Sequence, residues 1–262
     1  MKLNIIPVKK GLTWVKDGIR TFWRQPLAFT GLFFLFMAWV SLLSMVPVIG
    51  SAMALLILPA ATLGLMVATE QASLGKFPMP TVLMVAFRAG QQRLKAMMVL
   101  GVLYALSFLL VMALSALVDG GAFAKVYLAN APITPELVNG ADFQMAMWLA
   151  TILYIPLSML FWHAPALVHW YGVPPVKSMF FSAVACWRNL GAFAVYLLAW
   201  AAVFVTGATL ILTLSGALGG NDLTAAVLMP GALLMAAMFF TSVYFSVKDC
   251  FDLPLPGSQT EA

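Results

Sequence analysis

The stretch LGAFAVYLLAWAAVFVTGATLILTLSGAL, residues 190–218, decides the fold class. It contains no charged residue and no histidine, and its apolar residues are continuous and do not alternate with polar ones. A helix rises about 1.5 Å per residue, so about 20 apolar residues cross a hydrocarbon core about 30 Å thick. Because this run exceeds that length, it predicts a transmembrane helix that is tilted or begins in the membrane interface.

Five further uncharged apolar runs reach or approach the same length, at residues 28–46, 48–69, 96–118, 143–162 and 223–247. The whole chain of 262 residues is 63% hydrophobic and only 9% charged. Soluble domains carry about 25% charged residues, so this chain lacks the polar surface that a fold in water needs. We therefore predict an all-α polytopic membrane bundle of six transmembrane helices in three hairpins, forming a single integral membrane domain over residues 1–262.

The connections between the runs define the predicted hairpins. Residues 47–50 and 219–222 contain the proline and glycines of tight turns, and residues 119–142 form a longer loop. Within that loop Thr134, Pro135 and Glu136 predict a helix start, with threonine as the N-cap and proline in the first turn.

The basic residues predict the orientation. All but one of the 14 lysines and arginines fall on one side of the six runs, and only Lys125 falls on the other. Positive charge is retained on the cytoplasmic side, so we expect a bacterial inner-membrane protein with both termini in the cytoplasm. Beside Lys2, Lys76 and Lys248, this side holds our candidate contacts for anionic lipid headgroups or an acidic partner, namely Lys9, Lys10, Lys16, Arg20, Arg24, Arg88, Arg93, Lys95, Lys177 and Arg188.

The predicted partner of this basic side is the lipid bilayer. A pI near 9.3 is also typical of nucleic-acid-binding proteins, but the chain has no soluble segment that combines basic and aromatic residues. We therefore expect no nucleic-acid partner. A protein partner stays open and unidentified.

A basic, partly amphipathic segment precedes each hairpin. The first has one helical stripe with Lys9, Thr13, Lys16, Arg20 and Arg24 and an opposite apolar stripe with Leu12, Val15, Ile19 and Phe22. This pattern predicts a helix lying in the membrane surface. In the second, Arg88, Gln92 and Lys95 are expected to share a face, and in the third Lys177 and Arg188 do so. Together with similar glycine-to-proline stretches at residues 75–78 and 172–175, this predicts repeat-like units at residues 1–72, 73–170 and 171–250, followed by a flexible cytoplasmic tail at 251–262.

Some short motifs resemble a known family. The stretch 182–189, with Ala164 and Pro165 upstream, and the stretch 47–50, with Leu58 and Pro59 after it, are similar to an uncharacterised family of bacterial six-helix inner-membrane proteins. The resemblance spans most of the chain. It implies a fold and a membrane location, but no activity, and it carries no functional residue.

The chain shows no catalytic, cofactor or metal motif, and we predict a non-enzymatic protein without a cofactor. The six apolar runs contain no Asp, Glu, Lys, Arg or His, which argues against a proton-driven transporter. Glu70 is expected at a solvated helix end. His163 and His169 are six residues apart, which places them on different helix faces and is unsuited to sharing a metal. Cys186 and Cys250 are expected to be reduced, small core or interface residues.

Pro59, Pro156 and Pro230 are candidate helix kinks, because proline removes a helical hydrogen bond. Our first functional hypothesis is a membrane scaffold, partner subunit or lipid-interacting module of unknown molecular role. The alternative is a passive or gated carrier of an apolar or lipid-like substrate, with a mid-membrane cavity lined by these three prolines. A membrane enzyme would need Glu70 to approach His163 and His169.

Overall fold

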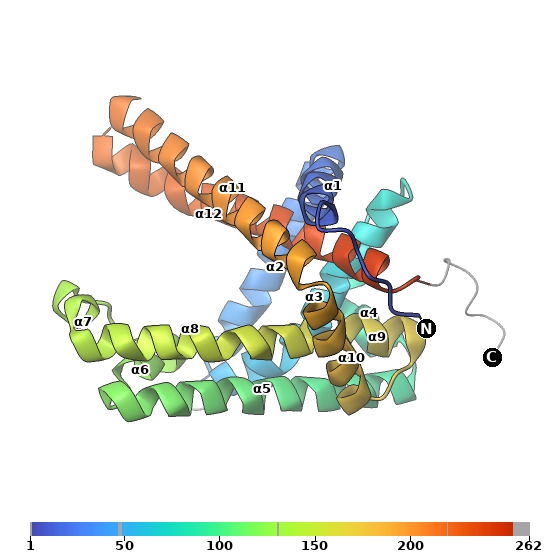
Figure 1. The fold of residues 1–262 in the computed structure, drawn as a ribbon. Coiled ribbons are helices and arrows are strands. Elements are labelled where there is room, and N and C mark those ends of the chain that lie inside the picture. The colour runs from blue at the N-terminus through green and yellow to red at the C-terminus, as the bar shows by residue number, and fades with distance from the viewer. Residues whose placement is uncertain (1, 47–48, 130, 219, 254–262) are drawn as a thin grey trace. The chain divides into compact units, whose positions relative to one another are not determined.

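The computed structural model describes residues 2–46, 49–129, 131–218 and 220–253, and these are almost entirely helical (Figure 1). In chain order the helices are α1 (Lys10–Arg24), α2 (Pro26–Ser44), α3 (Gly50–Ser73), the 3-10 helix η1 (Pro80–Met84), α4 (Val85–Arg88), α5 (Gln91–Asp119), α6 (Ala122–Ala129), α7 (Pro135–Asn139), α8 (Ala141–Phe161), α9 (Ala164–Tyr171), α10 (Pro175–Arg188), α11 (Leu190–Leu218) and α12 (Gly220–Cys250). An isolated antiparallel bridge joins Leu3 to Phe251.

Among the described residues, six helical segments are long and apolar enough to cross a membrane, as the sequence predicts. They are Pro26–Ser44, Gly50–Ser73, Gln91–Asp119, Ala141–Tyr171, Leu190–Ala217 and Ala226–Cys250. Large apolar side chains stay exposed along them, including Leu198 and Val205 of α11. A water-soluble protein rarely exposes apolar surface of this extent, so these faces are suited to lipid.

The chain forms two compact units, which are described separately. Unit 1 consists of residues 1–36, 62–85 and 185–262, and unit 2 of residues 37–61 and 86–184. The predictions of a single domain, three hairpins and repeat-like units stay predictions.

In unit 1 the core lies where α1 packs across α11 and α12, which themselves run side by side (Figure 1). Trp14 and Phe22 of α1 are buried there, as are Tyr196 and Trp200 of α11. Gly18 makes the close approach of helices possible, because a Cβ atom at this position would collide with the backbone and Cβ of Ser242 in α12. The hydroxyl of Ser242 lies 2.6 Å from the Tyr196 hydroxyl and accepts a hydrogen bond from the Trp200 indole at 3.1 Å.

In unit 2 the long helices α5 and α8 pack along each other, and the short helix α6 packs on both. The ring of Tyr104 on α5 meets that of Phe161 on α8 edge to face, with centroids 5.0 Å apart. Gly101 lies against the backbone carbonyl of Leu56 in α3, where a side chain would not fit. The sequence did not predict α6, because its apolar stretch is short.

The connecting segments confirm one prediction and correct another. Thr134 caps α7 as predicted, since its hydroxyl accepts a hydrogen bond from the Leu137 N–H at 3.3 Å. Gly75 and Gly172, which the sequence aligns, both adopt positive φ after a helix end. The prediction that Arg88, Gln92 and Lys95 share one helical face is wrong. Gly90 has a φ of 90° and separates α4 from α5.

Other predicted boundaries fall at the edge of the described residues. The turns expected at 47–50 and 219–222 each include residues outside the described part. Phe251, the first residue of the predicted tail, is fully buried and pairs with Leu3. Residues 254–262 of that tail lie outside the described residues.

Candidate functional site

The first residues of the chain, 2–9, form an N-terminal arm that is bonded to the end of α12. The backbone N–H of Asn4 donates to the carbonyl of Cys250 at 2.9 Å. The Asn4 side-chain amide donates to the Asp249 carbonyl at 3.2 Å and to Asp252 Oδ1 at 2.9 Å. These bonds extend the pairing of Leu3 with Phe251, so the two ends of unit 1 are held together.

Asn189, between α10 and α11, fixes the same arm from the other side. It is buried, and its Oδ1 accepts a hydrogen bond from the Ile6 N–H at 2.7 Å. Its Nδ2 donates to the carbonyls of Asn4 at 3.1 Å and Ala185 at 3.0 Å. A buried amide needs such partners, and here they determine the path of the arm. Sequence reasoning placed Asn189 in a family motif but gave it no role.

Asp249 joins α12 to the start of α1. One carboxylate oxygen lies 3.2 Å from Lys10 Nζ and accepts a hydrogen bond from Trp14 Nε1 at 2.9 Å. Trp14 is fully buried and its ring contacts those of Phe193 and Tyr196. The carboxylate therefore satisfies an indole N–H that has left water. The sequence did not predict this interaction, because the partners are far apart in the chain.

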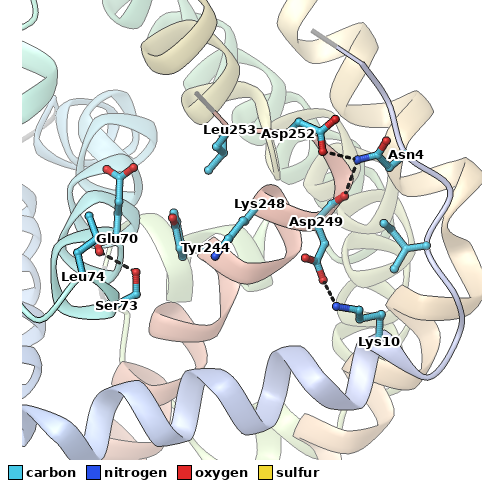
Figure 2. Close-up of a pocket in the computed structure, with 11 residues that line it drawn as sticks. Asn4, Lys10, Glu70, Ser73, Leu74, Tyr244, Lys248, Asp249, Asp252 and Leu253 are labelled. Carbon is cyan, nitrogen blue, oxygen red and sulfur yellow. Dashed lines mark hydrogen bonds and ion pairs between the residues drawn. The ribbon is translucent and has the colours of Figure 1, made fainter. Parts of the chain in front are cut away.

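Beside these bonds lies a cleft of about 530 Å³, which we call the polar cleft (Figure 2). One wall is the last turn of α3, the other is the end of α12 with the N-terminal arm, and Tyr244 and Lys248 lie between them. Its lining comprises Asn4, Ile6, Lys10, Glu70, Ser73, Leu74, Tyr244, Lys248, Asp249, Asp252 and Leu253. All of these belong to unit 1.

The charges of the polar cleft are mixed. Three carboxylates and two ammonium groups line it, and Lys10 is paired with Asp249. Glu70 and Asp252 stand on opposite walls, and the Lys248 side chain extends into the space between them (Figure 2). Among the described residues Lys248 forms no salt bridge. The cleft can therefore receive a small ligand that carries charge of both signs.

The basic residues predicted as headgroup contacts are mostly exposed. In unit 1, Lys9, Lys16, Arg20, Arg24 and Arg188 are exposed and Lys10 is partly exposed. In unit 2, Arg88, Lys95 and Lys177 are exposed and Arg93 is partly exposed. Lys177 and Arg188 lie on the single helix α10, as predicted. Their role as headgroup contacts stays a prediction.

Helix α1 presents different surfaces around its axis. Val15 and Phe22, which the sequence assigns to the apolar stripe of a surface helix, pack into the protein core instead of lipid. Two other apolar side chains stay outside, with Leu12 44% and Trp23 63% exposed. At about 100° per residue, Leu12 and Trp23 lie between the buried face and the stripe of Lys16. An apolar strip beside a cationic one is typical of a helix at a membrane surface.

A second cleft, of about 340 Å³, lies in unit 2 where α5 begins. Gln92, Arg93 and Ala96 line it together with residues 172–175 of the loop before α10. A third, of about 160 Å³, lies along α2 and the first half of α3, where the Ser51 hydroxyl donates to the Leu128 carbonyl at 2.6 Å. Both are smaller and carry fewer charges than the polar cleft.

The histidines occupy separate structural positions. His163 is fully buried at the break between α8 and α9, where its backbone N–H donates to Ser182 Oγ at 2.9 Å. The Ser182 hydroxyl in turn donates to the Met159 carbonyl at 2.7 Å, which closes the end of α8. His169 lies against the Trp170 ring, with centroids 5.4 Å apart. Glu70 lines the polar cleft at the last turn of α3.

Both cysteines are buried thiols, at the positions the sequence assigns to core or interface residues. The Asn189 amide lies 3.7 Å from Cys250 Sγ. Burial, with a smaller effect of Cys250, raises the pKa of the Cys186 thiol. In the described part of the chain no three His, Cys, Asp or Glu side chains gather in a way that could hold a metal ion.

The three candidate kink prolines all lie inside helices, Pro59 in α3, Pro156 in α8 and Pro230 in α12. Pro59 is buried, whereas Pro156 and Pro230 are exposed. Of the three clefts described above, none is lined by any of these prolines.

Six spanning helices with lipid-suited faces define a multi-pass α-helical membrane protein. Comparison with known proteins identifies a family within this class. The chain is 40% identical over 261 residues to a "probable inner membrane protein" of Burkholderia thailandensis, and the match covers 98% of this chain and 97% of that one. The chain belongs to this family of inner-membrane proteins. No family profile and no solved structure matches it.

Proposed function

We propose that this inner-membrane protein is a non-enzymatic lipid-interacting module that binds anionic phospholipid headgroups on its basic side. We take that side to be cytoplasmic, because lysine and arginine gather there. The protein would hold lipid at the membrane surface, either alone or as a subunit of a larger assembly.

The observation that carries this proposal is the surface of α1. The helix is attached to the protein by its buried face, so its orientation is fixed. Leu12 and Trp23 are then exposed beside Lys16 and Arg20. Tryptophan favours the interface, apolar side chains enter the acyl boundary, and cations attract anionic headgroups. The same helix therefore offers apolar contact with the acyl boundary and electrostatic attraction for anionic headgroups.

The test removes two positive charges from α1 without touching its buried face. In the double variant that combines Lys16→Gln and Arg20→Gln, each lost charge weakens binding to an anionic surface by about 1 kcal/mol. Retention of anionic lipid should therefore fall roughly 30-fold. The full-length protein is purified in mild detergent, and bound phosphatidylglycerol and cardiolipin are quantified by mass spectrometry. Lys125→Gln, an exposed charge of α6, is the matched control and should retain wild-type levels.

Equal anionic lipid in the double variant and in the control would contradict the proposal. The same preparations reveal any protein that copurifies in stoichiometric amounts, which would identify a scaffold or partner-subunit role.

The alternative carrier would need a mid-membrane cavity lined by Pro59, Pro156 and Pro230. The clefts described above are lined by other residues, and the largest lies where the α3 and α12 spans end. We therefore favour the lipid-interacting module over the carrier.

A further inference from the structure

We propose that the polar cleft of unit 1 binds a phosphate group joined to a primary ammonium, the headgroup chemistry of phosphatidylethanolamine. The inference rests on the proposed function in taking a membrane phospholipid as the ligand, but it concerns different residues and a different headgroup.

The position of the polar cleft fits a lipid headgroup. The α3 span ends at Ser73 and the α12 span at Cys250, and residues of both last turns line the cleft. The ends of transmembrane helices lie at the level of the headgroups, just outside the hydrocarbon core. A volume of about 530 Å³ is within the range of small-molecule sites.

The carboxylates of the cleft favour an ammonium group. Lys10 pairs with Asp249, Asp252 accepts a hydrogen bond from the Asn4 amide, and Glu70 lines the opposite wall, so the cleft carries carboxylates on both sides. The C-terminal ends of α3 and α12 add partial negative charge, which further favours a cation. A primary ammonium has three N–H donors and can bond to a carboxylate of either wall, whereas a trimethylammonium has none.

The lysine between the two walls favours a phosphate. Lys248 forms no salt bridge among the described residues, and its side chain extends into the cleft (Figure 2). A ligand with positive charge alone would meet repulsion from this ammonium. A phosphate linked to an ammonium by a short ethylene chain satisfies Lys248 and the carboxylates together.

The experiment compares headgroups on the full-length protein in detergent by native mass spectrometry. We expect phosphatidylethanolamine to bind at least about tenfold more tightly than phosphatidylcholine, because the hydrogen bonds of its ammonium to carboxylates are charge-assisted. Glu70→Gln should abolish this preference, and Lys248→Gln should weaken binding of both lipids. Two exposed charges of unit 2, in α6 and α7, provide matched controls, namely Lys125→Gln and Glu136→Gln, which should behave as wild type.

A further arm separates the two sources of this chemistry. If soluble O-phosphoethanolamine, at the concentration of the lipid, displaces phosphatidylethanolamine, the headgroup alone is recognised. If it does not displace the lipid, the acyl chains are needed as well. Either result supports the site. Equal binding of phosphatidylethanolamine and phosphatidylcholine by the wild type, or wild-type binding in folded Glu70→Gln and Lys248→Gln, would overturn it. The α1 double variant should keep the phosphatidylethanolamine preference, so failure of this site is distinguishable from failure of the proposed function.

Discussion

The bond between Trp14 and Asp249 gives the sharpest test of what holds unit 1 together. Asp249→Ala removes the acceptor of a fully buried indole N–H as well as the partner of Lys10. An unsatisfied buried donor costs about 1–3 kcal/mol, whereas an ion pair between partly exposed groups contributes less than about 1 kcal/mol. Together these predict a loss of about 2–3 kcal/mol in Asp249→Ala.

Two further variants separate the two contributions. Asp249→Asn keeps an oxygen that can accept from Trp14 but loses the charge, and Lys10→Gln loses only the ion pair. Both should cost less than about 1 kcal/mol. The expected order of destabilisation is therefore Asp249→Ala well above Asp249→Asn and Lys10→Gln.

Alkylation of Cys250 measures this loss directly. The thiol is fully buried and the residue's carbonyl is bonded to the N-terminal arm, so a reagent reaches it only when this region opens. With opening in rapid equilibrium, the rate at pH 8, resolved by peptide mass spectrometry, should rise roughly 30- to 150-fold in Asp249→Ala and less than about fivefold in the other two variants. If Asp249→Asn reacts as fast as Asp249→Ala, or if Asp249→Ala reacts at the wild-type rate, the reasoning is refuted.

Three other predictions concern unit 1. Gly18→Leu should detach α1, because the side chain would collide with Ser242. Overpacking costs about 1–3 kcal/mol or more, so the thermal midpoint in detergent should fall. An unchanged midpoint would contradict this packing of α1 on α12. Ser242→Ala removes a buried hydrogen-bond partner of the Tyr196 hydroxyl and the Trp200 indole, at a cost of about 1–3 kcal/mol. Tryptophan fluorescence should then report unfolding at a lower temperature. Ser242→Thr keeps a hydroxyl and tests whether that group is the cause. Cys186 should be alkylated slowly at pH 8 and faster as the pH rises, because burial raises its thiol pKa. The native state then keeps a proton that the unfolded chain releases, so the free energy of unfolding falls as the pH rises through the ordinary range of a thiol pKa. Fast alkylation of the folded protein at pH 8 would contradict this.

The six spans could be predicted because their signal is local. Each is a continuous apolar run, and the cost of exposing backbone polar groups in lipid makes such a run helical whatever it packs against. Helix boundaries were harder to predict where a single residue causes the break. Gly90 separates α4 from α5, and a single glycine inside a basic segment did not distinguish a break from a continuous helix.

The polar cleft could not be predicted in the same way. Its walls combine the N-terminal arm with residues of α3 and α12, and Asn4 and Asp252 are separated by almost the whole chain. Amphipathic periodicity gave α1 a buried face, but it could not show whether lipid or protein covers that face. Side-chain pairs such as Trp14 with Asp249 arise only when the helices have packed.

The pairing of Leu3 with Phe251 has a consequence for synthesis. Unit 1 combines residues made before unit 2 with residues made after it, whereas unit 2 is complete once residue 184 has been made. The arm and α1 must therefore wait until α12 has been inserted and its last turn is available. A nascent chain released before that turn would leave the Trp14 indole and the Asn4 side-chain amide without their acceptors, and quality-control proteases could recognise such an incomplete product.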